Sequence, residues 1–122
     1  MTGLEKILII EDELIISTSV CELLEHLGYK NVEIAESIEE GIASLKAKNY
    51  DLVLMDVFLG NGLNGIDIIS EIQKTKPIPV IYLSGHSDHA TLNKAKTTFP
   101  MAFLSKPVSE TTLKIQLAIF LK

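Results

Sequence analysis

Short apolar runs recur along the chain and alternate with longer segments of mixed polarity. The runs cover residues 7–10, 32–35, 52–55, 80–83 and 101–104. The gaps between them are about 16 to 24 residues long, which suits helical crossovers but not tight hairpins, so we predict a parallel sheet. Only the run at residues 32–35 alternates polar and apolar positions, and we expect this strand at an edge of the sheet.

The segments between the runs carry helix signals. The apolar positions at helical spacing are Ile16, Val20, Leu23, Leu24 and Leu27 in the first segment, Ile69 and Ile72 in the third, and Leu113, Leu117 and Phe120 in the last. Gly28 should end the first helix, a capping box at residues 37–40 should begin the second, and Ser109 should cap the last. The fourth segment, around residues 88–98, has the weakest pattern because it ends in two threonines with Pro100 just beyond.

This alternation predicts a single α/β domain over residues 1–122, with a doubly wound five-stranded parallel sheet and helices on both of its faces. Hydrophobic residues make up 47% of the chain and charged residues 22%, which suits one core but leaves no room for a second folded domain.

Charge and hydropathy exclude several classes of protein. A net charge of −5 and a pI near 5.1 give no basic surface for nucleic acid within this chain. No apolar run approaches membrane-spanning length, and residues 11–13 are acidic where a signal peptide would need a cleavage site, so we expect a cytoplasmic protein that does not enter the membrane. The single cysteine, Cys21, excludes an internal disulfide and is interpreted as core filling.

Reactive side chains follow the apolar runs at the points where the strands should end. Glu11 and Asp12 follow the first run, Asp56 the third, Ser84 the fourth and Lys106 the fifth. Because the carboxyl ends of parallel strands meet at one edge of a sheet, three acids, a hydroxyl and a lysine should converge there. For Asp56 alone, a second interpretation is that it only begins a turn.

Three carboxylates this close require a cation nearby. Each pair at 4 Å repels by on the order of 4 kcal/mol at an effective dielectric of 20. Hard oxygen ligands at a solvent-open edge suit Mg²⁺, which retains waters and accepts carboxylates together with a phosphate. Lys106 adds a compact positive charge, and Ser84 can donate a hydrogen bond to a phosphoryl oxygen.

Four motifs in this order resemble the receiver domain of two-component response regulators. They are ILIIEDE (residues 7–13), DLVLMD (51–56), VIYLSG (80–85) and FLSKP (103–107). The resemblance covers essentially the whole chain and implies a flavodoxin-like sheet with strand order 2-1-3-4-5. It also implies that a sensor histidine kinase or a phosphotransfer protein transfers a phosphoryl group to an aspartate, which makes the chain a signalling phosphoacceptor that catalyses its own phosphorylation and dephosphorylation.

The resemblance assigns a role to each matching residue. The implied roles are phosphoacceptor for Asp56, Mg²⁺ or Mn²⁺ ligands for Glu11, Asp12, Asp56 and the backbone carbonyl of Phe58, switch hydroxyl for Ser84, phosphate-pairing lysine for Lys106, and switch aromatic for Phe103. It further implies a cis peptide bond before Pro107.

The chain departs from the usual receiver pattern around the site. The loop after Asp56 lacks a proline three or four residues on, and Gly65 comes one position late. Phe58 and His86 occupy positions that tune water access, so we expect slow intrinsic dephosphorylation. Gly85 replaces the commoner alanine and removes a methyl group beside the switch hydroxyl.

Several alternatives stay open at this point. Phe103 also fits a plain core position, and His86 and His89 could be imagined as a metal pair, although such histidines are usually surface residues. A flavin-binding module would need a phosphate loop where residues 11–13 are acidic. A Mg²⁺ phosphohydrolase would carry a second acid where Phe58 stands. A degenerate receiver would act only as an interaction module, against which the intact acids and lysine argue.

The last helix carries more apolar residues than one face can hold. At 100° per residue Ile115 and Ile119 fall off the stripe that should cover the sheet, so they should form an exposed strip. We expect this strip to mediate homodimerisation or docking of a downstream target, which the sequence does not name. The alternative is that it packs against a further C-terminal segment.

Overall fold

The computed structural model describes residues 3–57, 65–85, 93, 96–98 and 100–121. Its strands are β1 (Lys6–Ile10), β2 (Asn31–Ala35), β3 (Leu52–Asp56), β4 (Val80–Ser84) and β5 (Ala102–Ser105), and its helices are α1 (Leu14–His26), α2 (Ile38–Ala47), α3 (Gly65–Gln73) and α5 (Glu110–Phe120).

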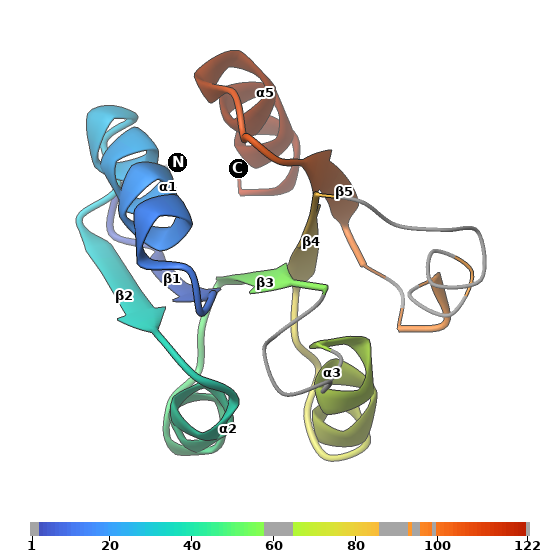
Figure 1. Cartoon of the computed structure of the whole chain (residues 1–122). Helices are drawn as coiled ribbons and strands as arrows, with labels where there is room; N and C mark the ends of the chain where they lie inside the picture. The colour runs from blue at the N-terminus through green and yellow to red at the C-terminus, as the bar shows by residue number, and fades with distance from the viewer. Residues whose placement is uncertain (1–2, 58–64, 86–92, 94–95, 99, 122) are drawn as a thin grey trace.

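All strand pairs are parallel, and the strand order in the sheet is β2-β1-β3-β4-β5. Figure 1 shows that α1 and α5 cover one face of the sheet and that α2 and α3 cover the other. The predicted α/β fold and strand order are therefore confirmed. The expectation that the alternating run forms an edge strand is confirmed too, since β2 lies at one end of the sheet.

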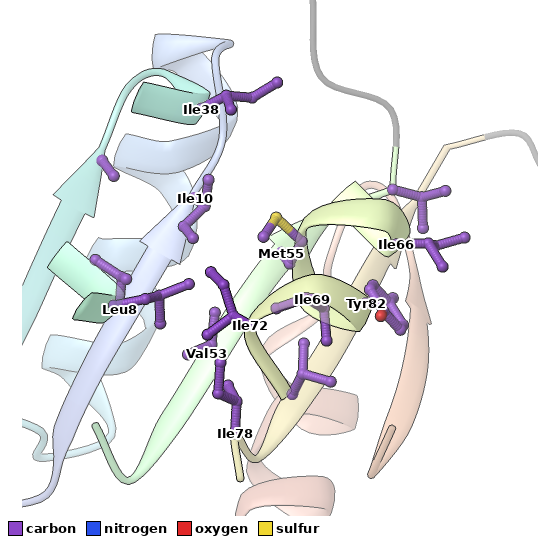
Figure 2. Packing of buried hydrophobic residues seen from close by; sticks show 14 residues of the cluster. Leu8, Ile10, Ile38, Val53, Met55, Ile66, Ile69, Ile72, Ile78 and Tyr82 are labelled. Carbon is purple, nitrogen blue, oxygen red and sulfur yellow. The ribbon is translucent and has the colours of Figure 1, made fainter. Parts of the chain in front are cut away.

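The strands direct alternate side chains into two separate cores. Odd positions of β1, such as Ile7 and Ile9, pack with Leu24, Leu113 and Leu117 from α1 and α5. Even positions pack with residues of α2 and α3 in a second core, whose 14 buried members Figure 2 draws. Because each fully buried aliphatic side chain stabilises the fold by about 1.5 to 3 kcal/mol, burial on both faces holds the central strands firmly and fixes where they end.

The helix boundaries mostly agree with the sequence signals. Gly28 follows α1 with a φ of 102°, and the Ser37 side chain accepts a hydrogen bond of 3.1 Å from the Glu40 backbone. The second half of the capping box differs slightly, because the Glu40 carboxylate accepts from the Glu36 backbone N–H at 2.9 Å. Ser109 caps α5 as predicted by accepting from Thr112 N.

Glu13, the last acid of residues 11–13, lies just before the first turn of α1. Glu13 is the N-cap of α1, with an extended backbone and no hydrogen bond from its own side chain to the helix. Its backbone N–H instead donates to Glu11 Oε1 at 3.2 Å, which holds the backbone short of helical geometry. The helix therefore begins at Leu14.

The apolar positions predicted for the third and last helices are buried where the structure describes them, namely Ile69, Ile72, Leu113 and Leu117. The side chain of Phe120 and most of the expected fourth helix lie outside the described residues. Cys21 is half-buried against the α1 and α5 core, where burial and then the Glu25 carboxylate raise its pKa to about 11, as suits a core residue. Among the helices that the structure describes, none has the length and apolar character needed to cross a membrane.

Candidate functional site

The site lies at the edge of the sheet where the strands end. Backbone hydrogen bonds continue the ladder past these ends, from Glu11 N to Ala35 O at 3.1 Å, from Val57 N to Leu83 O at 3.1 Å and from Lys106 N to Ser84 O at 3.0 Å. The residues that follow each strand are therefore held as rigidly as the strands themselves. This explains why side chains so distant in sequence keep fixed positions relative to one another.

Two buried carboxylates share one ammonium group in this site. Glu11 is 0% exposed and Asp56 is 4% exposed. Lys106 Nζ lies 2.9 Å from Glu11 Oε2 and 3.1 Å from Asp56 Oδ1. Burial of the pair in a region of low dielectric makes both ion pairs stronger than equivalent pairs in water, and it also makes the unbalanced negative charge more costly.

The pKa values of these groups reflect that imbalance. Burial, supported by the negative charge of Asp56, raises the pKa of Glu11 to about 7, although Lys106 and the Glu13 backbone oppose the change. Burial alone would lower the pKa of Lys106, but the Glu11 and Asp56 carboxylates outweigh it and raise that pKa. Lys106 thus stays charged, and the carboxylates around it remain short of positive charge.

Asp12 completes a cluster that could hold a metal ion. One carboxylate oxygen from each of Glu11, Asp12 and Asp56 lies within 4.8 Å of the others. Asp12 is exposed, so the cluster opens to solvent on that side. Glu11 Oε2 accepts no regular hydrogen bond from the described residues despite its contact with Lys106. Hard oxygen donors with surplus negative charge fit a divalent cation.

The structure places the predicted hydroxyl at the same edge. Ser84 is the last residue of β4, is half-buried and pairs in register with Ser105 of β5. A Cβ added at Gly85 would lie 3.8 Å from Lys106 Cδ, which is ordinary van der Waals contact. The peptide bond between Lys106 and Pro107 is cis, so that expectation is confirmed.

Three of the predicted positions around the site fall on residues that are not described. Phe58, whose carbonyl was assigned to the metal, lies outside the described residues, as do the two histidines His86 and His89. The shape of the loop between Asp56 and Gly65 is likewise left as a prediction.

Phe103 lies on β5 and is half-buried against the α2 and α3 core. Its ring stacks on the ring of Tyr82, with centroids 5.7 Å apart and an interplanar angle of 28°. Phe103 therefore contributes to the core, while its role as a switch stays a prediction.

A buried hydrogen bond beneath Phe103 was not among the features predicted from the sequence. The Tyr82 hydroxyl lies 2.7 Å from Thr98 Oγ1, and both residues are buried. A signal was available, because a tyrosine inside an apolar strand needs a polar partner for its hydroxyl. What the sequence could not show was which hydroxyl or carbonyl would supply it.

The sheet and its acidic edge together define a doubly wound α/β domain with a candidate cation site at the carboxyl ends of its strands. The family model of the response regulator receiver domain matches residues 7–118, and the chain belongs to this family. It is accordingly a phosphoacceptor domain of the two-component signalling class, as the motifs had implied.

Curated relatives and solved structures agree with this assignment. The chain is 34% identical over 116 residues to the transcriptional regulatory protein PdtaR of Mycobacterium tuberculosis, covering 93% of this chain and 56% of that protein. It is 30% identical over 116 residues to the transcriptional regulatory protein YvrH of Bacillus subtilis, covering 95% of this chain and 48% of that protein. The chain thus spans about half the length of these relatives.

Among solved structures, a CheY-like response regulator receiver domain protein from Methanospirillum hungatei superimposes with a TM-score of 0.87 at 27% sequence identity. The alignment covers 95% of this chain and 92% of that one. The N-terminal domain of a three-domain response regulator/sensory box/GGDEF protein from Carboxydothermus hydrogenoformans gives a TM-score of 0.85 at 30% identity, over 96% of this chain and 94% of that one.

Proposed function

We propose that Asp56 accepts a phosphoryl group from a phosphohistidine of a sensor histidine kinase or phosphotransfer protein. The observation that carries this proposal is the position of Asp56, which ends the central strand β3, belongs to the acid cluster and lies 3.1 Å from Lys106. Glu11 is less suited as the acceptor because it is 0% exposed, whereas Asp56 is 4% exposed.

The transfer is a simple displacement at phosphorus. A carboxylate oxygen of Asp56 forms the new P–O bond, the P–N bond to the donor histidine breaks, and the histidine nitrogen keeps the electron pair. Little covalent chemistry is left to the protein, so its residues act by positioning and by electrostatics. Lys106 pairs with the phosphoryl oxygens, and Ser84 donates a hydrogen bond to one of them.

The acid cluster supports a divalent cation in this reaction. Glu11, Asp12, Asp56 and the Phe58 carbonyl would hold Mg²⁺ or Mn²⁺, which when bound neutralises the charge that the carboxylate meets on the phosphoryl group. The same residues would also promote hydrolysis of the acyl phosphate, because in that reaction a water molecule attacks the same phosphorus atom. Phe58 and His86 would restrict that water and slow the loss of the phosphoryl group.

The phosphorylated state is read through Ser84 and Lys106. Their shift toward the phosphoryl group opens space near β5, into which the half-buried Phe103 ring moves. The surface of β5 and α5 changes with it. Ile115 and Ile119, which are 53% and 52% exposed, supply the apolar strip through which this surface would bind a downstream target or a second copy of the chain in the cytoplasm.

Incubation with acetyl phosphate and Mg²⁺, followed by intact mass spectrometry, tests the proposal. We expect the mass of one added phosphoryl group, which disappears when the divalent cation is chelated. An unmodified chain after prolonged incubation with both acetyl phosphate and a cognate phosphohistidine donor would contradict the proposal.

A further inference from the structure

The ring of Tyr82 is fixed at both ends. Its backbone belongs to β4, which is paired on one side with β3 and on the other with β5. Its hydroxyl lies 2.7 Å from Thr98 Oγ1, in the segment that leads into β5, and the ring is 0% exposed within the α2 and α3 core (Figure 2). A tyrosine held in this way has little freedom to turn or shift.

The pair is a neutral hydrogen bond at all ordinary pH values. Burial raises the pKa of Tyr82 to about 12, although the Thr98 hydroxyl opposes the shift. The phenol therefore keeps its proton, and the strength of the contact does not vary with the protonation of Tyr82.

The ring of Phe103 packs against the ring of Tyr82. The two residues are register partners across β4 and β5, and their rings stack. Ser84 lies two residues further along β4 and therefore projects from the same face of the sheet as Tyr82. A movement of the Phe103 ring along the strand toward Ser84 would therefore take it away from its stack on the tyrosine ring.

We propose that Tyr82, anchored by Thr98, is a positioning residue that holds Phe103 in its resting place and so sets how readily the phosphorylated state forms. This inference rests on the proposed function, because it assumes that Phe103 moves inward when Asp56 is phosphorylated. The hydrogen bond to Thr98 contributes more in the resting arrangement, where it holds the tyrosine ring in position for the stack with Phe103, than in the switched arrangement, where that stack is lost. Its removal shifts the equilibrium toward the switched arrangement.

Linkage gives this shift a measurable consequence. A phosphoryl mimic that binds the switched arrangement better binds more tightly when that arrangement is more populated. A lost buried hydrogen bond of ordinary strength corresponds to a tightening of about threefold to tenfold. The rate of phosphorylation itself depends on the acids and Lys106, which neither residue touches in the contacts described above.

The experiment uses the chain labelled with 4-fluorophenylalanine and titrated with beryllofluoride in the presence of Mg²⁺. The fluorine resonance of Phe103 is assigned with Phe103→Leu. Tyr82→Phe keeps the ring but removes the hydroxyl, and Thr98→Val keeps the shape of its side chain but removes the oxygen. In both variants we expect the Phe103 resonance of the free protein to move toward its beryllofluoride-saturated position and the apparent affinity for beryllofluoride to rise about threefold to tenfold.

The double variant and a matched control make the test specific. Because both substitutions remove the same contact, the double variant should have no larger effect than either single one. Tyr50→Phe also removes a half-buried hydroxyl, which contacts Glu33, and should leave both measurements unchanged.

Two outcomes would overturn the inference, and they differ in meaning. If the wild-type Phe103 resonance responds to beryllofluoride but Tyr82→Phe and Thr98→Val leave its position and the affinity unaltered, the pair is only structural. If the wild-type Phe103 resonance stays fixed at saturating beryllofluoride, the proposed switch is wrong and this inference falls with it.

Discussion

Charged side chains are buried at the carboxyl ends of the strands but exposed at the amino ends. At the carboxyl edge, Glu11 and Asp56 are buried and share the ammonium of Lys106. At the amino edge, lysines lie in the surface around the strand beginnings, and the principal pair, Lys48 with Glu33 at 2.8 Å, is about half exposed.

This difference distinguishes charge that is paired at the surface from charge that is concentrated in the candidate site. Charged groups at the amino edge have protein partners nearby: Lys76 Nζ donates to Lys48 O at 2.8 Å, and Asp51 accepts from the Lys6 backbone at 2.8 Å. Exposed pairs of this kind are screened and contribute little. The carboxyl edge keeps an excess of negative charge where solvent cannot screen it, which is costly unless a cation or a phosphoryl group with its cation arrives.

The largest expected effect compares the two ends of β3. Asp56→Asn should abolish labelling by acetyl phosphate with Mg²⁺, because an amide is no nucleophile toward phosphorus. Asp51→Asn, the same change just before the other end of the strand, should be labelled like the wild type. Intact mass spectrometry of both variants makes the measurement, and equal labelling of Asp56→Asn would show that the acceptor lies elsewhere.

The next effect concerns the metal. Asp12→Ala should weaken Mn²⁺ binding about tenfold or more, because it removes the exposed oxygen ligand of the cluster. Glu13→Ala is the matched control, since it changes the net charge equally but removes an acid with no resolved part in the cluster. Calorimetric titration measures both, and an unchanged affinity in Asp12→Ala would contradict the assigned metal site.

A smaller effect tests the energetic side of the comparison. In metal-free buffer, Asp56→Asn should raise the free energy of unfolding by about 1 to 2 kcal/mol, because Lys106 then serves one buried carboxylate instead of two. Glu33→Gln at the amino edge should leave the urea midpoint unchanged or slightly lower. Added Mg²⁺ should reduce the difference in the free energy of unfolding between Asp56→Asn and the wild type, because it should stabilise only the wild type. A destabilised Asp56→Asn variant would mean that its ion pair with Lys106 outweighs the repulsion.

The smallest expected effect is on the α5 surface. The experiment tests whether binding of a phosphoryl mimic at the carboxyl edge changes self-association through this surface. Beryllofluoride should strengthen any self-association seen by analytical ultracentrifugation, and Ile115→Glu with Ile119→Glu should remove that increase. Lys114→Glu is the control, because this exposed residue lies about 100° or more around the helix from both isoleucines and the substitution changes the net charge as much as the double variant does; it should not remove the increase. A chain that is monomeric with and without beryllofluoride, and whose double variant binds its target normally, would rule out this surface.

Much of the architecture was predictable because it depends on local patterns. Apolar runs of strand length separated by helical crossovers already imply a parallel sheet, and the carboxyl ends of such strands must share an edge. The same pattern predicts that Glu11, Asp56, Ser84 and Lys106 lie at one edge. The exposure of Ile115 and Ile119 also followed from helical periodicity alone.

The remaining features depend on long-range packing, which local patterns do not contain. Nothing in the sequence says that Lys106 contacts both Glu11 and Asp56, or that Glu11 is entirely buried. The hydrogen bond between Tyr82 and Thr98 joins two segments whose approach is set by the packing of β5 against β4. The strand order itself came from the family resemblance, because a run of alternating strands and helices is compatible with more than one order.

The way Lys106 bridges the site has a consequence for the folding of the chain. Lys106 lies 50 residues after Asp56 and 95 residues after Glu11 in the sequence, so its two contacts form only once β1, β3 and β5 all lie in one sheet. A nascent or partly folded chain has the acids but not the assembled pocket. The proposed transfer to Asp56 would therefore require that β1, β3 and β5 have already assembled, so it would depend on completed folding of this part of the sheet as well as on the signal.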